Sequence, residues 1–212
     1  MKFYAHSTEQ QNKSDWQGLS EHLPSVGDLA EEFAAHFGAQ KMARTAGLLH
    51  DLGKYTQEFQ KRLEGGPRVD HSAWGARVVL ERYEQLGQLL AYTIAGHHAG
   101  LADGRVADDQ KRTSLADRLA AGLPELLNDW EKEIALPSSK ELNLPEGFKP
   151  RPDRGMFQLS LLVRMIFSCL VDADFIDTDE FYRQIEGKAP RRGVIHPAME
   201  QLRECLDQYL AK

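Results

Sequence analysis

The chain has 212 residues, of which 42% are hydrophobic and 27% charged, and its formal net charge is −6 at neutral pH. This length and composition are typical of one or two small globular domains, and they exclude low-complexity and collagen-like chains. The negative charge excludes a surface that is basic throughout, so any attraction to nucleic-acid phosphates must be local or supplied by bound cations.

Helical periodicity dominates the chain, whereas the apolar–polar alternation typical of strands is scarce. Asp28 followed by Glu31 resembles a capping box, which predicts a first helix that begins at Asp28 and ends at Gly38. The same periodicity predicts further helices at 39–52, 56–64, 71–86, 88–98, 114–121, 124–135, 157–174, 178–186 and 197–211. We therefore expect an all-α fold, a compact orthogonal helical bundle in a single domain over residues 1–212.

Breaks in the helical pattern predict where the chain turns. Gly87 is expected to separate the fourth and fifth of these helices. Residues 99–113 and 136–155 are loop-like, so the region 99–155 is expected to consist partly of insertion loops. The C-terminal segment 188–212 is expected to contain an amphipathic helix.

Cysteine usage and hydropathy bear on the cellular setting. Cys169 and Cys205 do not form a CxxC pair, so they predict neither a disulfide framework nor a structural zinc site, and a reducing, cytoplasmic location is expected. Residues 1–16 lack the apolar core of a signal peptide. The longest apolar stretch, 159–171, is interrupted by Arg164 and is too short to span a bilayer, so no membrane association is expected.

The same apolar stretch, 159–171, is typical of a central, buried helix, and it runs directly into Asp172-Ala173-Asp174. A carboxylate at the end of a buried helix is costly unless it is paired, hydrogen-bonded or bound to a cation. We prefer Asp172 over Asp174 as the functional carboxylate, because Ser168, four residues earlier, would continue its face into the apolar helix.

Histidines next to diagnostic neighbours suggest a metal centre, since imidazole and carboxylate together suit first-row transition metals. Two adjacent histidines at a helix end, as in the pair formed by His97 and His98, are uncommon on a surface. The candidate ligands are His22, His50, Asp51, His71, His97, His98 and Asp172. Ligands so far apart in the chain can meet only where several helix ends converge. The other three histidines, His6, His36 and His196, are interpreted as structural or surface residues.

The segment from His50 to Lys54 ends an apolar helix and carries the most specific chemistry. The carboxylate of Asp51 has two oxygens and can therefore bridge two metal ions. Lys54 lies three residues further, on the same face if the helix continues, and could contact a phosphate. The alternative for Lys54 is a solvated surface lysine.

Five motifs in this order resemble the HD nuclease domain of the CRISPR-associated type I helicase-nuclease, within the HD phosphohydrolase superfamily. They are Ala5-His6-Ser7 with Trp16 and His22-Leu23, His50 to Lys54 with Phe59-Gln60, His71-Ser72 with Gly75-Ala76, Gly96 to Leu101 with Asp103-Gly104, and the aspartate-rich string 172–179. The resemblance extends from residue 5 to about residue 182. No helicase motif follows in this sequence, so the resemblance implies either a stand-alone nuclease subunit or a domain whose segment 188–212 leads to a helicase in a longer chain.

The resemblance implies an HD-type helical bundle that hydrolyses phosphodiester bonds of single-stranded DNA during CRISPR interference, an antiviral defence. Two divalent transition-metal ions, Mn, Ni, Co or Fe rather than Mg, would be the cofactors. One ion would be held by His22, His50, Asp51 and Asp172, and the other by Asp51, His71, His97 and His98. Asp51 and Lys54 would be the catalytic residues, and a CRISPR helicase with a guide-RNA surveillance complex would be the partners.

Two other functions stay open at this point. An HD-type phosphohydrolase acting on a nucleotide or cyclic dinucleotide could use a single ion on His22, His50, Asp51 and Asp172, and the extra histidines favour two ions without excluding such a substrate. A non-catalytic docking module would be expected to have lost ligands, whereas all seven candidates are present.

Overall fold

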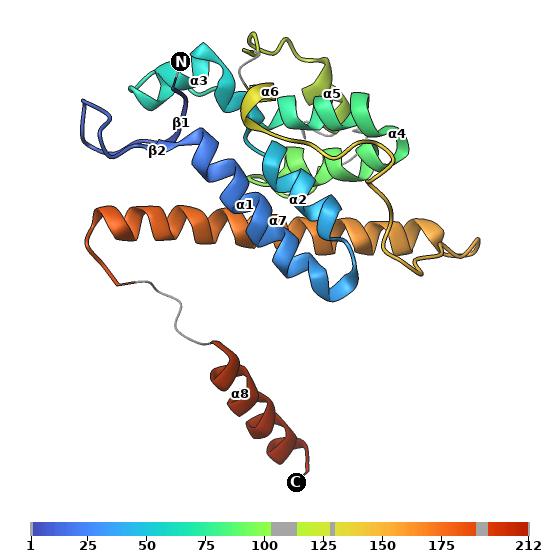
Figure 1. Ribbon diagram of the computed structural model, residues 1–212. Coiled ribbons are helices and arrows are strands. Elements are labelled where there is room, and N and C mark those ends of the chain that lie inside the picture. Colours follow the sequence, from blue (N-terminus) through green and yellow to red (C-terminus); the bar gives the residue numbers. More distant parts are fainter. Residues whose placement is uncertain (1, 103–113, 128–129, 190–194, 212) are drawn as a thin grey trace, which may run out of the picture. The chain divides into compact units, whose positions relative to one another are not determined.

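The computed structural model describes residues 2–102, 114–127, 130–189 and 195–211, without the side chains of 195–199. In chain order (Figure 1), the elements are β1 Tyr4–His6, β2 Gln17–Gly18, α1 Leu19–Ala34, η1 Ala35–Phe37, α2 Gln40–Leu49, η2 Leu52–Tyr55, α3 Gln57–Leu63, α4 Ser72–Gly96, α5 Leu115–Ala120, α6 Trp130–Glu133, α7 Gly155–Ile185 and α8 Ile195–Leu210. Helices make up nearly all the regular structure described, so the predicted all-α fold class is confirmed.

The chain divides into two compact units, Met1–Asp177 and Thr178–Lys212. The boundary lies within α7, and α8 belongs wholly to the second unit. Every candidate site residue belongs to the first unit. The single domain over residues 1–212 stays a prediction.

A short antiparallel pair of strands, which the sequence pattern does not predict, precedes α1. Tyr4 of β1 pairs with Gly18 of β2. A strand pair this short is marginal on its own. The side chain of Gln60 in α3 stabilises it, since Gln60 Nε2 donates to Tyr4 O (3.0 Å) and Gln60 Oε1 accepts from Tyr4 N (3.1 Å).

Helix α1 begins at Leu19, so the predicted start at Asp28 is wrong. The buried face of α1 continues without a break past this position, because Leu23, Val26 and Ala30 repeat at helical spacing. Asp28 is exposed and accepts a hydrogen bond from Arg44 of α2 instead of capping a helix. The predicted end at Gly38 agrees with the structure: α1 runs into η1, which Gly38 terminates with a left-handed φ of 76°.

Helix α4 is two helices joined at a sharp turn, with non-helical backbone at Tyr83 and Glu84. A straight helix of this length would span about 37 Å, whereas Ser72 Oγ at its start lies 3.5 Å from the carbonyl oxygen of Ala95 near its end. The two predicted helices are therefore present, but they separate at Tyr83–Glu84 and not at Gly87. Gly87 lies beside the first half, where a Cβ atom would come within 2.1 Å of Val79 O.

The region 99–155 contains two short helices among loops, as expected in part; its residues 103–113 and 128–129 lie outside the described segments. Helix α5 is close to its prediction, and a capping box of Ser114 and Asp117 fixes its start. Helix α6 is much shorter than the predicted 124–135. Helix α7 is continuous where two helices were predicted, since no Gly or Pro interrupts 156–186.

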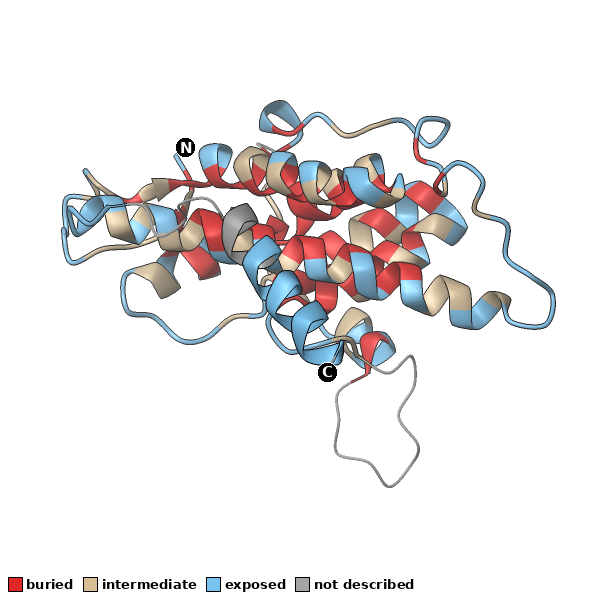
Figure 2. Cartoon of the chain, turned by 90° about the horizontal axis from the view of Figure 1, so that it is seen from below, coloured by how far each residue is buried: buried red, intermediate tan, exposed pale blue. Residues whose placement is uncertain are grey.

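The core of the first unit lies between α1, α2, α4 and α7. Figure 2 shows buried residues along the inward faces of these helices and exposed residues on their outer faces. Leu23, Leu49, Ile94 and Leu170, one from each helix, are among the fully buried side chains. In the described part of the chain, no helix is both long and apolar enough to cross a membrane.

Candidate metal centre

The predicted ligands lie at helix ends that converge in the first unit. His50 ends α2, Asp51 precedes η2, His71 precedes α4 and His97 follows it. His22 and Asp172 are the exceptions, because they lie within α1 and within α7. The turn at Tyr83–Glu84 explains the convergence at α4: it returns the chain so that His71 and His97 meet although an entire helical hairpin separates them in sequence.

The two carboxylate oxygens of Asp51 face two different sets of imidazoles. Asp51 Oδ2 lies 3.5 Å from His22 Nε2 and 3.4 Å from His50 Nε2. Asp51 Oδ1 lies 3.2 Å from His71 Nε2 and 3.3 Å from His97 Nε2. Two ligands of one ion, each bonded at about 2.0–2.2 Å, are separated by distances of this size. The arrangement therefore fits two ions that share the Asp51 carboxylate.

Asp174, and not Asp172, is the carboxylate of α7 that reaches this cluster. Asp174 Oδ1 lies 3.6 Å from His22 Nε2 and 3.5 Å from His50 Nε2. Asp172 is exposed and belongs to none of the ligand groups found in the described residues. The preference for Asp172 is therefore wrong, and the reason is which face of α7 is buried. Ser168, four residues before Asp172, is exposed, whereas Leu170, four residues before Asp174, is fully buried.

Three of the imidazoles are held in one tautomer and orientation by their Nδ1 atoms. Nδ1 of His50 lies 2.7 Å from Gly47 O, and Nδ1 of His97 lies 2.7 Å from Ile94 O. Since a carbonyl oxygen only accepts, each Nδ1 carries the hydrogen and donates it. Nδ1 of His22 donates in the same way to Asp177 Oδ2, at 2.7 Å. Each Nε2 lone pair is therefore left free to bind a cation, the arrangement common among metal-ligating histidines.

Several polar atoms at the centre are buried and have no hydrogen-bond partner among the described residues. Besides Nδ1 of His71, they are Nε2 of His22, His50 and His97, and Oδ1 of Asp51. A buried polar atom without a partner is costly, and in native proteins it usually marks a bound ion, water or functional group. Since the Nε2 atoms offer imidazole lone pairs and Oδ1 is a carboxylate oxygen, the residues present fit a divalent transition metal.

The ligand atoms form overlapping sets rather than one compact group. In the described segments, the sets whose atoms all lie within 4.8 Å of one another are Asp51, His71, His97 and His98; His22, His50 and Asp51; His6, His22 and Asp174; and His50, His97 and Asp174. His98 joins through Nε2, which lies 2.9 Å from His71 Nε2. Six of the seven predicted ligands thus lie together, and Asp174 stands in place of the seventh.

The imidazoles fall into two electrostatic classes. Burial lowers the pKa of His97, and partial burial of its ring together with the adjacent His97 lowers the pKa of the more exposed His98 to about 4. Both rings are therefore neutral at pH 7, the form that binds metals. Burial also opposes charge on His50, but the carboxylates of Asp51 and Asp174 outweigh it and raise its pKa to about 10. The surroundings of His50 thus favour a positive charge, which a metal ion would supply.

Both carboxylates at the centre are ionised. Burial would raise the pKa of Asp51, but Lys54 and His50 hold it well below its usual range. His50 does the same for the pKa of Asp174 against the effect of burial. The buried carboxylate of Asp51 and the partly buried carboxylate of Asp174, which face several imidazoles, form a site suited to a cation.

Two residues near the centre were not singled out as site residues from the sequence. His6, interpreted as structural or surface, shares a ligand set with His22 and Asp174, and its ring centroid lies 5.0 Å from that of His22. The AHS motif was its only sequence signal. Asp177, which orients His22, was not singled out. Of the other histidines so interpreted, His36 is exposed and the side chain of His196 lies outside the description.

Lys54 is buried, which excludes the alternative of a solvated surface lysine. Its side chain is 5% exposed, and its Nζ lies 2.5 Å from Asp51 Oδ2 and 3.0 Å from Ala5 O. Gly53, beside it, allows the backbone before α4 to approach, because its N donates to His71 O (2.9 Å) and a Cβ there would lie 2.4 Å from the same oxygen. Lys54 is thus placed against the shared carboxylate.

Replacing Lys54 by Met is expected to slow hydrolysis about 10²–10³-fold, the usual cost of removing one charged transition-state contact, while both ions stay bound. Single-turnover rates and metal content, measured on the same samples, test this. A wild-type rate would remove Lys54 from the catalytic residues. Loss of metal would show that it acts by holding Asp51 and not by contacting phosphate.

Among the described residues, a cavity reaches the centre at His71 and His98. Its volume is about 700 Å³, and Asp70, Leu101 and Arg118 contribute to its lining. His98 is exposed, whereas His22, His50 and Asp51 are buried. A substrate would therefore meet the centre first at its His71–His98 side.

Comparison with protein families agrees with this geometry. Residues 19–122 match the family model described as HD domain. That segment contains His22, His50, Asp51, His71 and the His97-His98 pair, but not Asp174. No curated protein matched the chain. The family match supports the HD phosphohydrolase superfamily and a metal-dependent hydrolase in general.

Proposed function

From the HD domain at residues 19–122 and its His/Asp cluster, we propose that this protein is a two-metal phosphodiesterase that cleaves single-stranded DNA. The observation that carries the proposal is the position of Asp51: one oxygen faces His22 and His50, and the other faces His71 and His97. A single-ion site would need only one of these faces. The further histidines on the Oδ1 side support a second ion.

The proposed ligands would be divided between two ions. One ion would be held by His22, His50, Asp51 and Asp174, and the other by Asp51, His71, His97 and His98. When bound, a pair of such ions activates water and neutralises the leaving oxygen of an in-line phosphoryl displacement.

The protein's own groups fix the geometry around that reaction. The Nδ1 hydrogen bonds of His22, His50 and His97 orient the rings before substrate arrives, so little reorganisation is needed. Lys54 adds a positive charge at Asp51 Oδ2. Leu52 and Tyr55, next to these polar residues, are fully buried and exclude water from the inner side of the centre.

Charge favours single-stranded over duplex DNA as the substrate. The net charge of −6 leaves no general basic surface to hold two strands, so attraction would come from the ions. A flexible strand can also bring one phosphate into line with the two ions more readily than a stiff duplex. We propose that a CRISPR helicase, fused or separate, and a guide-RNA surveillance complex deliver this strand.

The substrate prediction is that linear and circular single-stranded DNA are cleaved while intact duplex is left largely uncut. Cleavage should require Mn²⁺, Co²⁺ or Ni²⁺ more than Mg²⁺, because imidazole is a poor ligand for magnesium. The measurement is cleavage of each DNA after chelation and re-addition of each metal in turn. Nucleotides and cyclic dinucleotides are assayed beside them.

The outcomes of these assays distinguish the candidate functions. Cutting of circular strands would identify an endonuclease. Equal rates on duplex and single strands, or full activity in EDTA, would contradict the proposal. Hydrolysis of nucleotides without DNA cleavage would favour a nucleotide phosphohydrolase.

A further inference from the structure

We propose that Arg118 of α5 is a positioning residue for the ion held by His71, His97 and His98. This inference rests on the proposed two-ion function and adds a residue to it. Arg118 does not belong to any of the ligand sets and lies outside every motif singled out in the sequence.

The guanidinium of Arg118 joins both ends of the α4 hairpin. Its Nη2 lies 2.7 Å from Asp70 Oδ2 and 2.6 Å from Ser72 Oγ, on either side of His71. Its Nη1 donates to the carbonyl oxygen of Ala95, two residues before His97. One side chain therefore fixes the distance between the two chain segments that carry these histidines.

Arg118 lines the cavity at this side of the centre, but most of its donors are directed toward protein acceptors. Asp70 pairs with it through both carboxylate oxygens, at 2.9 and 2.7 Å from Nη2, and Nε also donates to Asp70 at 3.1 Å. Ser72 and Ala95 take the remaining contacts. The charge is neutralised and these donors are directed toward protein, so the role of Arg118 is geometric.

The arrangement can contribute to stability as well as to geometry. The Asp70 side chain is 42% exposed, which weakens an ion pair, but a bidentate arginine–carboxylate pair is the arrangement of surface charges most able to stabilise a fold. In addition, a planar guanidinium that holds several acceptors at once restricts their relative positions in a way that a lysine does not. Residues that orient metal ligands typically alter metal affinity about 10–100-fold when they are replaced.

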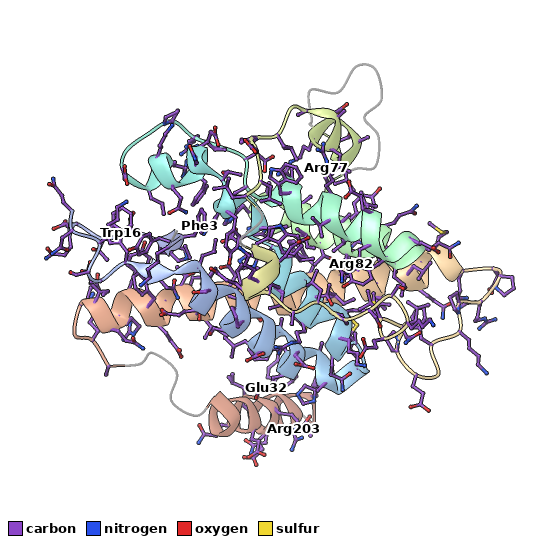
Figure 3. All side chains as sticks on the ribbon, turned by 45° about the horizontal axis from the view of Figure 1, so that its top comes forward. Phe3, Trp16, Glu32, Arg77, Arg82 and Arg203 are labelled. Atoms are coloured by element: carbon purple, nitrogen blue, oxygen red, sulfur yellow. The ribbon has the colours of Figure 1, made fainter. Side chains whose placement is uncertain are left out.

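Arg77 provides a matched control. It also joins α4 to α5, since Arg77 Nη2 donates to Leu119 O at 2.6 Å, but it bonds to neither Asp70, Ser72 nor Ala95. Arg77 is labelled in Figure 3, on α4 next to α5. Replacing it removes an arginine–carbonyl bond between the same two helices and leaves the bonds around His71 and His97 in place.

The experiment is a calorimetric titration of the metal-free full chain with Co²⁺, for wild type, Arg118→Gln, Arg118→Lys and Arg77→Gln. We expect Arg118→Gln to lower the affinity for one of the two ions about 10–100-fold and the affinity for the other less than about twofold. Arg118→Lys should restore little of the lost affinity, and Arg77→Gln should leave the affinities for both ions near those of the wild type. The Asp174→Asn variant is expected to lose the ion on the His22 and His50 side. Adding Arg118→Gln to it should lower the affinity for the ion that remains.

Equal weakening of both ions, or unchanged affinities in Arg118→Gln, would overturn the inference. If that variant does not fold, as judged by circular dichroism, Ser72→Ala decides: it removes one Arg118 contact and should weaken the same ion up to about tenfold, and unchanged affinities would refute the role of Arg118. Two bound ions without phosphodiester cleavage would refute the proposed function alone. A single bound ion in wild type would refute both.

Discussion

Replacing Asp51 by Asn is expected to abolish hydrolysis and to lower the occupancy of both metal positions. Each Asp51 oxygen faces its own set of imidazoles, so the loss of its charge affects two ions at once. Removing one electrostatic contact in an active site costs about 10²–10³ in rate, and a shared ligand should cost at least about 10³. Cleavage rate and metal content per chain are the measurements.

Non-additive effects of two substitutions distinguish a ligand shared by two ions from a ligand of one ion. Adding His71→Gln to Asp51→Asn should cause little further loss, because the second ion is already weakened. Asp28→Asn is the control, since it removes an exposed carboxylate paired with Arg44. If Asp51→Asn kept both ions and cleaved at the wild-type rate, the two-ion assignment would be wrong.

Asp174→Asn is expected to remove the ion on the His22 and His50 side and to lower the rate at least about 10²-fold, whereas Asp172→Asn should behave as wild type. Asp174 Oδ1 lies within 3.6 Å of Nε2 in both histidines, while Asp172 is exposed. The two aspartates are two residues apart on α7, so each is a control for the other. Metal content and single-turnover cleavage of both variants provide the comparison.

The reverse result would restore Asp172 as the preferred ligand of α7. If Asp172→Asn lost an ion and Asp174→Asn did not, the phase of α7 in this structure would be wrong at the centre. Thermal unfolding of both variants without metal separates loss of the ion from loss of the fold.

Local sequence patterns were sufficient to predict the fold class and most of the cluster. Helical periodicity predicted an all-α chain, and unusual local strings identified His50-Asp51, His71 and His97-His98 before any contact was known. These signals are local, because a histidine pair between glycines or an HD step after an apolar helix is visible within a few residues. That these residues bind metal stays a prediction.

The packing of the helices established which carboxylate of α7 faces the cluster and what orients the ligands. The apolar residues of 159–171 surround the helix, so periodicity leaves its rotation undetermined, and packing against the core turns Asp174 inward. His6, Asp177 and Arg118 act through partners distant in sequence. Their positions depend on how β1, α5 and α7 pack against the ends of α1, α2 and α4, which no local pattern encodes.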